Sequence, residues 1–138
     1  MKRWLWKLII SCIVFFVLSK AFFALAQRPV RIEEVMANIA RTHNANPKLD
    51  QMTVSSVATA SARKVTFHNV MRIKKGLTPS EMANFQAAIR EELLPQACAV
   101  NREVFSWKKG ISYAYVYDNT YGERIGELLV DERACGVK

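Results

Sequence analysis

The chain has 138 residues, of which 51% are hydrophobic, and its formal net charge is +8. This length gives room for one domain and excludes an assembly of several. Of the 20 lysines and arginines, four lie in the first 20 residues, so the rest carries 16 against 12 acidic residues, a net of +4. Half of the net charge therefore lies in the first 20 residues, and we expect no nucleic-acid partner.

Residues 1–26 are predicted to be a signal peptide or a membrane anchor. A basic start is followed by the apolar run Leu8–Leu18, and Ala24 and Ala26 form a small-x-small cleavage site. The alternative is an uncleaved transmembrane helix, because Leu5 to Ala26 reaches the length of about 20 residues that a span needs. Lys20 disfavours the span, since a charge in the hydrocarbon costs about 3 kcal/mol. Both interpretations place the remaining chain outside the cytoplasm, either periplasmic or secreted, or anchored to the inner membrane and facing the periplasm.

The first half of the exported part predicts one helix and two strands. We expect a linker and this helix in residues 27–50, and the remainder of a single α+β domain in residues 51–138. Apolar residues recur at helical spacing in residues 31–42, and Pro47 with its asparagine neighbours ends the helix. Residues 52–59 and 64–73 are rich in β-branched side chains and predict strands, with a bulge near Asn69 and Val70.

The second half begins with a strong helix signal. Thr78 is a predicted N-cap, Pro79 takes the first helical position, and Glu81 completes a capping box. Pro95 should kink or end this helix, because proline has no N–H to donate. Residues 101–109 then form either a helical turn or an irregular connection. Residues 111–118 and 125–130 predict two further strands, joined by a turn at residues 119–122.

The order of these elements is α-β-β-α-β-β. It predicts an α+β fold with a four-stranded antiparallel sheet and two main helices on one face, preceded by the apolar leader helix.

Cysteine usage agrees with export. Cys12 belongs to the leader, which leaves Cys98 and Cys135 as a pair in an oxidising compartment, where a disulfide bond is the expected state. Two separate buried thiols are the alternative.

No motif in the chain predicts catalysis. His43 and His68 lack neighbours at ligand spacing, and there is no phosphate-binding loop or nucleophile elbow. We therefore expect no enzyme, no metal, no cofactor and no small-molecule substrate.

Two groups of residues could instead contact a protein partner. Tyr113, Tyr115 and Tyr117 share one strand face, and they either form a stacking surface or pack beneath the second helix. Arg72, Lys74 and Lys75 form a basic group that could face an acidic partner or anionic lipid, or simply be solvated.

From Leu93 onward the chain resembles a group of small exported bacterial proteins of unknown function. The matching pattern is L-L-P-Q-A-C98, then G110-x-x-Y-x-Y-x-Y-D118, then G122-x-x-I125 and C135. The resemblance implies a periplasmic α+β domain with a disulfide between helix and strand, and it implies no activity.

We therefore expect a non-catalytic envelope protein that binds another envelope protein, as an accessory of a secretion or conjugation apparatus. A periplasmic inhibitor or immunity-type protein against a toxin or hydrolase is the alternative.

Overall fold

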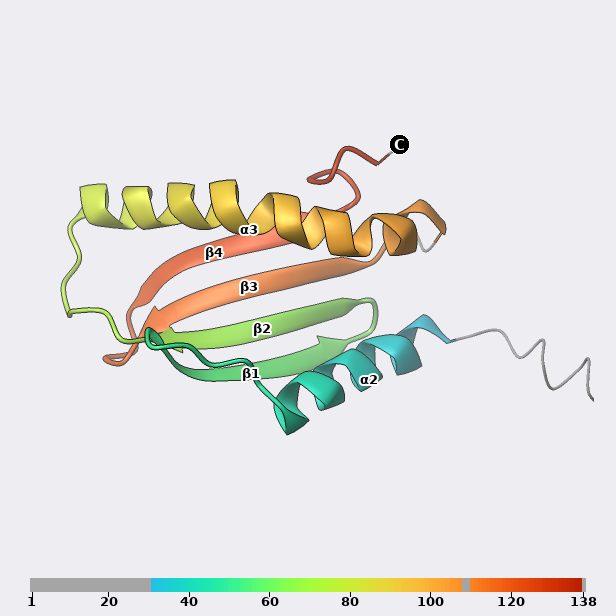
Figure 1. The fold of residues 1–138 in the computed structure, drawn as a ribbon, viewed down its shortest axis with the longest axis horizontal. Helices are drawn as coiled ribbons and strands as arrows, with labels where there is room; N and C mark the ends of the chain where they lie inside the picture. Colours follow the sequence, from blue (N-terminus) through green and yellow to red (C-terminus); the bar gives the residue numbers. More distant parts are fainter. Residues whose placement is uncertain (1–30, 108–109, 138) are drawn as a thin grey trace, which may run out of the picture. The chain divides into compact units, whose positions relative to one another are not determined.

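The computed structural model describes residues 31–107 and 110–137, without the side chains of residues 106 and 107. Its elements form the predicted α-β-β-α-β-β order of an α+β fold (Figure 1). They are α2 (Ile32–Ala45), β1 (Thr53–Ser61), β2 (Lys64–Met71), α3 (Pro79–Trp107), β3 (Ser112–Asn119) and β4 (Arg124–Asp131). The leader, with the cleavage site at Ala24 and Ala26, lies outside the described residues. Within the described ranges, neither helix is long and apolar enough to cross a membrane.

The sheet is mixed and has the strand order β1-β2-β3-β4. The outer pairs β1–β2 and β3–β4 are antiparallel, whereas β2 and β3 are parallel from Lys64↔Ser112 to Met71↔Asn119. The expectation of a fully antiparallel sheet was therefore wrong. A parallel pair needs a long crossover, and α3 supplies it by carrying the chain back along the sheet before β3 begins.

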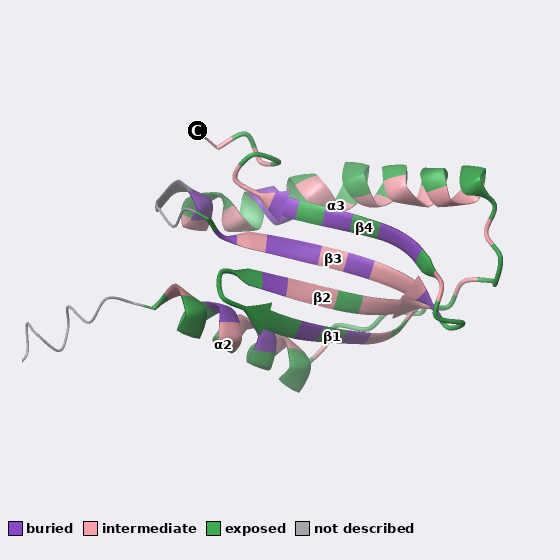
Figure 2. Ribbon diagram, turned by 180° about the vertical axis from the view of Figure 1, so that it is seen from behind, coloured by how far each residue is buried: buried purple, intermediate pink, exposed green. Residues whose placement is uncertain are grey.

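Both helices lie on one face of the sheet, as the sequence predicts. α2 runs along β1 and α3 runs along β4 (Figure 1), and the view from behind shows the strands uncovered by either helix (Figure 2). The register places Tyr113, Tyr115 and Tyr117 of β3 on the helix face, opposite residues of β4 that contact α3. The core lies between this face and the helices, and its largest fully buried apolar side chains are those of Phe105, Met36, Val65 and Val130.

The capping box at the start of α3 is confirmed. The Glu81 N–H donates to the Thr78 hydroxyl at 3.2 Å, and the Thr78 N–H donates to the Glu81 carboxylate at 2.8 Å. Lys74 adds an ion pair with the other Glu81 oxygen at 2.6 Å. The bond to Lys74, followed by those from Thr78, lowers the pKa of Glu81 to about 2.

α3 continues for 29 residues and contains Pro95 in its interior. The helix does not end at Pro95, so that alternative was wrong, and residues 101–107 are the last turns of the same helix. Proline costs a helix one hydrogen bond and about 3 kcal/mol. Burial of Ala97, Cys98 and Phe105 against the sheet, beyond the proline, offsets this cost. Because the helix continues past Pro95, Cys98 lies within it rather than after it. Cys98 forms the predicted disulfide with Cys135, with sulfur atoms 2.05 Å apart.

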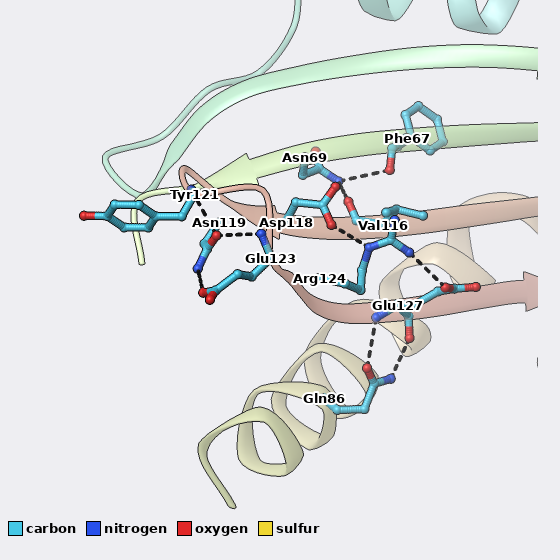
Figure 3. A network of polar contacts seen from close by, with 10 residues as sticks. All are labelled: Phe67, Asn69, Gln86, Val116, Asp118, Asn119, Tyr121, Glu123, Arg124 and Glu127. Carbon is cyan, nitrogen blue, oxygen red and sulfur yellow. Dashed lines mark hydrogen bonds and ion pairs between the residues drawn. The ribbon is translucent and has the colours of Figure 1, made fainter. Parts of the chain in front are cut away.

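Asn119 joins the β3–β4 turn to the loop that leads into α3. Its side chain is 1% exposed. The carboxamide oxygen accepts the N–H groups of Tyr121 and Glu123, and its nitrogen donates to the Glu123 carboxylate and the Lys74 carbonyl (Figure 3 shows the bonds to Tyr121 and Glu123). The same carboxylate accepts the Gly76 N–H at 2.9 Å. This side chain is buried but fully bonded, so it fixes the geometry of the entry to α3.

The disulfide predicts a redox-dependent stability. Replacing both cysteines, in Cys98→Ser/Cys135→Ser, should lower the free energy of unfolding by about 3–4 kcal/mol, because the bond closes a long loop of the unfolded chain. Denaturant unfolding measures the effect. Reductant should destabilise the wild-type protein by a similar amount and leave the double variant unchanged; equal sensitivity of the two would contradict the assignment.

Glu81 predicts a pH-dependent contribution to stability. Its pKa falls to about 2 in the folded protein from an ordinary 4.5, so its contribution is complete above pH 4.5 and is lost as the pH falls towards 2. In Glu81→Gln, the free energy of unfolding should fall less steeply over this window. Glu91→Gln, an exposed position on the same helix, serves as the control and should keep the wild-type slope.

Candidate functional site

A groove opens between α3 and the connection from α2 to β1. Its volume is about 330 Å³, and its floor is formed by the ends of β2 and β3. It exists because α2 lies along β1 and α3 lies along β4, which leaves the central strands between them (Figure 1). The lining residues are Lys48, Asp50, Thr53, Asn69, Met71, Phe85, Ala88, Ile89, Glu92, Leu93 and Tyr117.

Aromatic rings make up the floor of the groove. Phe85 of α3 meets Tyr117 of β3 edge to face, with ring centroids 5.7 Å apart. This contact depends on Gly126 of β4, because a Cβ there would lie 2.9 Å from two Phe85 ring atoms and 3.1 Å from the Ile89 Cδ1. Burial raises the pKa of Tyr117 to about 12 from an ordinary value of 10.0, because the charged phenolate loses its hydration.

A chain of polar side chains connects α2 to the floor. The Ser56 hydroxyl donates to the Asn69 carboxamide oxygen at 2.7 Å, and the His43 Nε2 lies 2.8 Å from the same hydroxyl. Since the single hydroxyl proton of Ser56 goes to Asn69, the imidazole is the donor in the other bond. His43 therefore does not act as a base toward Ser56 in this arrangement, and the chain positions α2 over β1.

The connection at the other wall is held by an aspartate. Asp50 accepts the N–H groups of Met52 and Thr53 at 2.8 and 2.7 Å. Hydrogen bonding by Thr53, first from its side chain, lowers the pKa of Asp50. Large apolar side chains in and beside this connection are exposed, by 51% at Leu49 and 48% at Met52. These exposed apolar residues are neighbours in sequence of the groove-lining Lys48, Asp50 and Thr53.

The three tyrosines predicted to share one strand face have different surroundings in the structure. Tyr113 is buried and meets Phe105, with centroids 5.9 Å apart, and Tyr115 stacks on Phe67 at 5.0 Å. Tyr117 alone of the three lines the groove. A partner surface that includes half-buried Tyr115 and Tyr117 stays a prediction, whereas Tyr113 belongs to the core.

The predicted basic group lies outside the groove lining. Arg72, Lys74 and Lys75 precede α3, and all three are exposed. Lys74 is engaged by Glu81 through the ion pair of the capping box. A role of this group in partner binding stays a prediction.

Among the described residues, the structure gathers no cluster of three or more His, Cys, Asp or Glu that could hold a metal ion. Sequence reasoning missed the groove itself, as well as Ser56 and Asn69. The one available signal was the polar Asn69 within an otherwise apolar strand face, and it was interpreted as a bulge. The register shift actually lies in β1, between Thr53 and Ser55.

The fold is similar to that of several proteins of known structure. Neither a known protein family nor a curated protein matches the sequence. The pilotin EpsS from the Vibrio vulnificus type 2 secretion system is similar with a TM-score of 0.59 and 18% identity, over 75% of this chain and 91% of that chain. The type II secretion system pilotin AspS from Vibrio cholerae is similar with a TM-score of 0.51 and 24% identity, over 81% and 99%.

A third similar structure comes from Pseudomonas aeruginosa and is described only as a protein expected to be secreted. Its TM-score is 0.58 with 12% identity, over 75% of this chain and 92% of that chain. At these identities the likeness establishes a shared fold.

The close approach at Gly126 predicts that one added methyl group reshapes the groove. Gly126→Ala should destabilise the protein by about 1–3 kcal/mol, because the Phe85 ring must move from its place on the sheet. Denaturant unfolding and the near-ultraviolet circular dichroism of Tyr117 and its neighbours measure the change. In a Phe85→Leu background the same substitution should cost less; an equal cost in both backgrounds would contradict the proposed clash.

Proposed function

We propose that this protein is a non-catalytic accessory of a bacterial secretion apparatus, exported to the envelope, and that it binds a protein component of that apparatus in the groove between α3 and the connection from α2 to β1. The observation that carries the proposal is the groove itself. It combines an aromatic floor with apolar α3 side chains and a polar rim containing Lys48, Asp50 and Glu92. This combination is typical of a site that takes a protein segment.

Three further observations support this function. The fold is shared with two pilotins of type II secretion systems. The disulfide fits an oxidising compartment. Leu49 and Met52, in the connection that forms one wall, are large apolar residues exposed to solvent, as residues at protein-binding surfaces often are. The comparisons offer no support for the conjugation or inhibitor alternatives.

A second hollow is a weaker candidate for the binding site than the groove. It has a volume of about 700 Å³ and lies at the far end of β3 and β4. Its walls are mainly turns, with Gly110 and Gly136 among them, and its side chains include the charged Asp131, Glu132 and Arg133. It lacks the aromatic floor that gives the groove apolar contact area.

Site-specific photo-crosslinking in the native host tests the proposal. A photoreactive phenylalanine analogue at Ala88, in the groove, should capture one envelope protein, which mass spectrometry then identifies as a secretion component. The matched control is the same analogue at Val57, which is 51% exposed on the sheet face opposite the helices. Equal capture at both positions would overturn the assignment to the groove.

A pair of leucine substitutions gives an independent test. Leu93→Glu places a charge in the groove and should abolish co-purification of the captured protein, since a charge is costly to bury in an apolar contact. Leu129→Glu, on the opposite face and 47% exposed, should leave co-purification intact. Retention of the partner by a folded Leu93→Glu variant would count against the proposed function.

A further inference from the structure

At each edge of the sheet, a side-chain carboxamide is bonded to the backbone N–H and C=O of one residue of the edge strand. On β1, the Asn44 amide donates to the Ala58 carbonyl at 2.8 Å and accepts the Ala58 N–H at 2.6 Å. On β4, the Gln86 amide donates to the Glu127 carbonyl at 2.6 Å and accepts the Glu127 N–H at 2.9 Å (Figure 3 shows the bonds between Gln86 and Glu127). Asn44 belongs to α2 and Gln86 belongs to α3, so each helix contributes one amide to the strand it covers.

The backbone N–H and C=O of Ala58 and of Glu127 face away from the sheet. Ala58 is paired with Phe67 of β2, and Glu127 is paired with Val116 of β3. In an antiparallel pair, alternate residues direct both their N–H and C=O toward the partner strand and the residues between them direct both outward. Ala58 and Glu127 are bonded to the helix amides through both groups, so they are outward-facing positions. An incoming strand would need these same groups.

The geometry imitates strand pairing. A carboxamide has an oxygen that accepts and an NH2 group that donates, and it exchanges two bonds with the backbone N–H and C=O of one residue, as a residue of an added strand does. The two amides therefore occupy the bonds that strand addition would use at the middle of each edge. A third contact extends the protection of β4, because the Cys135 N–H donates to the Asp131 carbonyl at 3.1 Å.

We infer that Asn44 and Gln86 are edge clamps that keep the sheet from pairing edge to edge with a second copy of this chain. Exposed edge strands template such pairing, and proteins block them with charges, bulges or covering elements. Here the covering elements are the two helices, each of which reaches the edge through one amide. The inference is independent of the proposed partner and of the groove.

Hydrogen exchange tests the clamps directly. In Gln86→Ala, the Glu127 amide should lose protection by about tenfold, the change expected from loss of one hydrogen bond worth about 1.4 kcal/mol. The neighbouring Leu128 amide faces β3 and should keep its protection. Asn44→Ala should act in the same way on the Ala58 amide. Unchanged protection at Glu127 and Ala58 would overturn the inference.

Self-association is the second readout. The double variant Asn44→Ala/Gln86→Ala should show a molar mass that rises with protein concentration in light scattering, beyond any rise in the wild-type protein. The matched control is Asn46→Ala/Gln96→Ala, which removes the same two residue types from exposed positions of the same region and helix.

Folding of the variants is checked by circular dichroism. If the double variant does not fold, Gln86→Met takes its place, because it keeps the side-chain length, adds no charge and removes both bonds to Glu127. Equal molar masses for clamp variants, controls and wild type would overturn the inference.

Discussion

The parallel pairing of β2 and β3 is the constraint on which the rest of the structure depends. Two parallel neighbours cannot be joined by a tight turn, so the chain must cross the sheet between them. α3 makes this crossing with 29 residues, a length of about 43 Å at 1.5 Å per residue. Its start is fixed by Asn119 and the capping box, and its later turns are fixed by the Cys98–Cys135 disulfide and buried Phe105. With both parts held, the crossover keeps the two hairpins in register.

Local chemistry made much of this fold predictable, because capping, turns and strand alternation are set by neighbours in sequence. Thr78 and Glu81 show this for the start of α3. The Cys98–Cys135 bond was predictable for another reason, because these are the two cysteines outside the leader. The direction of β3 relative to β2 was missed because a helix between two strands permits either arrangement. Continuation of α3 through Pro95 was missed because it depends on burial of Ala97 and Phe105, a tertiary term that propensity does not contain.

The groove was equally beyond sequence reasoning. It is produced by the positions of α2 over β1 and α3 over β4, and no motif in either helix records that separation. The chain from His43 through Ser56 to Asn69 holds α2 toward one side of the sheet, and the contact of Phe85 with Gly126 holds α3 toward the other. Each contact joins residues that are distant in sequence. A serine in one strand and a glycine in another form no motif, so neither contact could be recognised from the sequence.

Because the helices are separated, the edges and the middle of the sheet have different surroundings. At the edges, the helix amides satisfy outward peptide groups at Ala58 and Glu127. In the middle, Phe85, Leu93 and Tyr117 present side chains to the groove. Strand addition gains affinity from the main chain and is tolerant of sequence, whereas a groove selects by the shape and chemistry of side chains. A domain whose edges are bonded at Ala58 and Glu127, and whose middle holds a groove, fits the proposed binding of one particular segment.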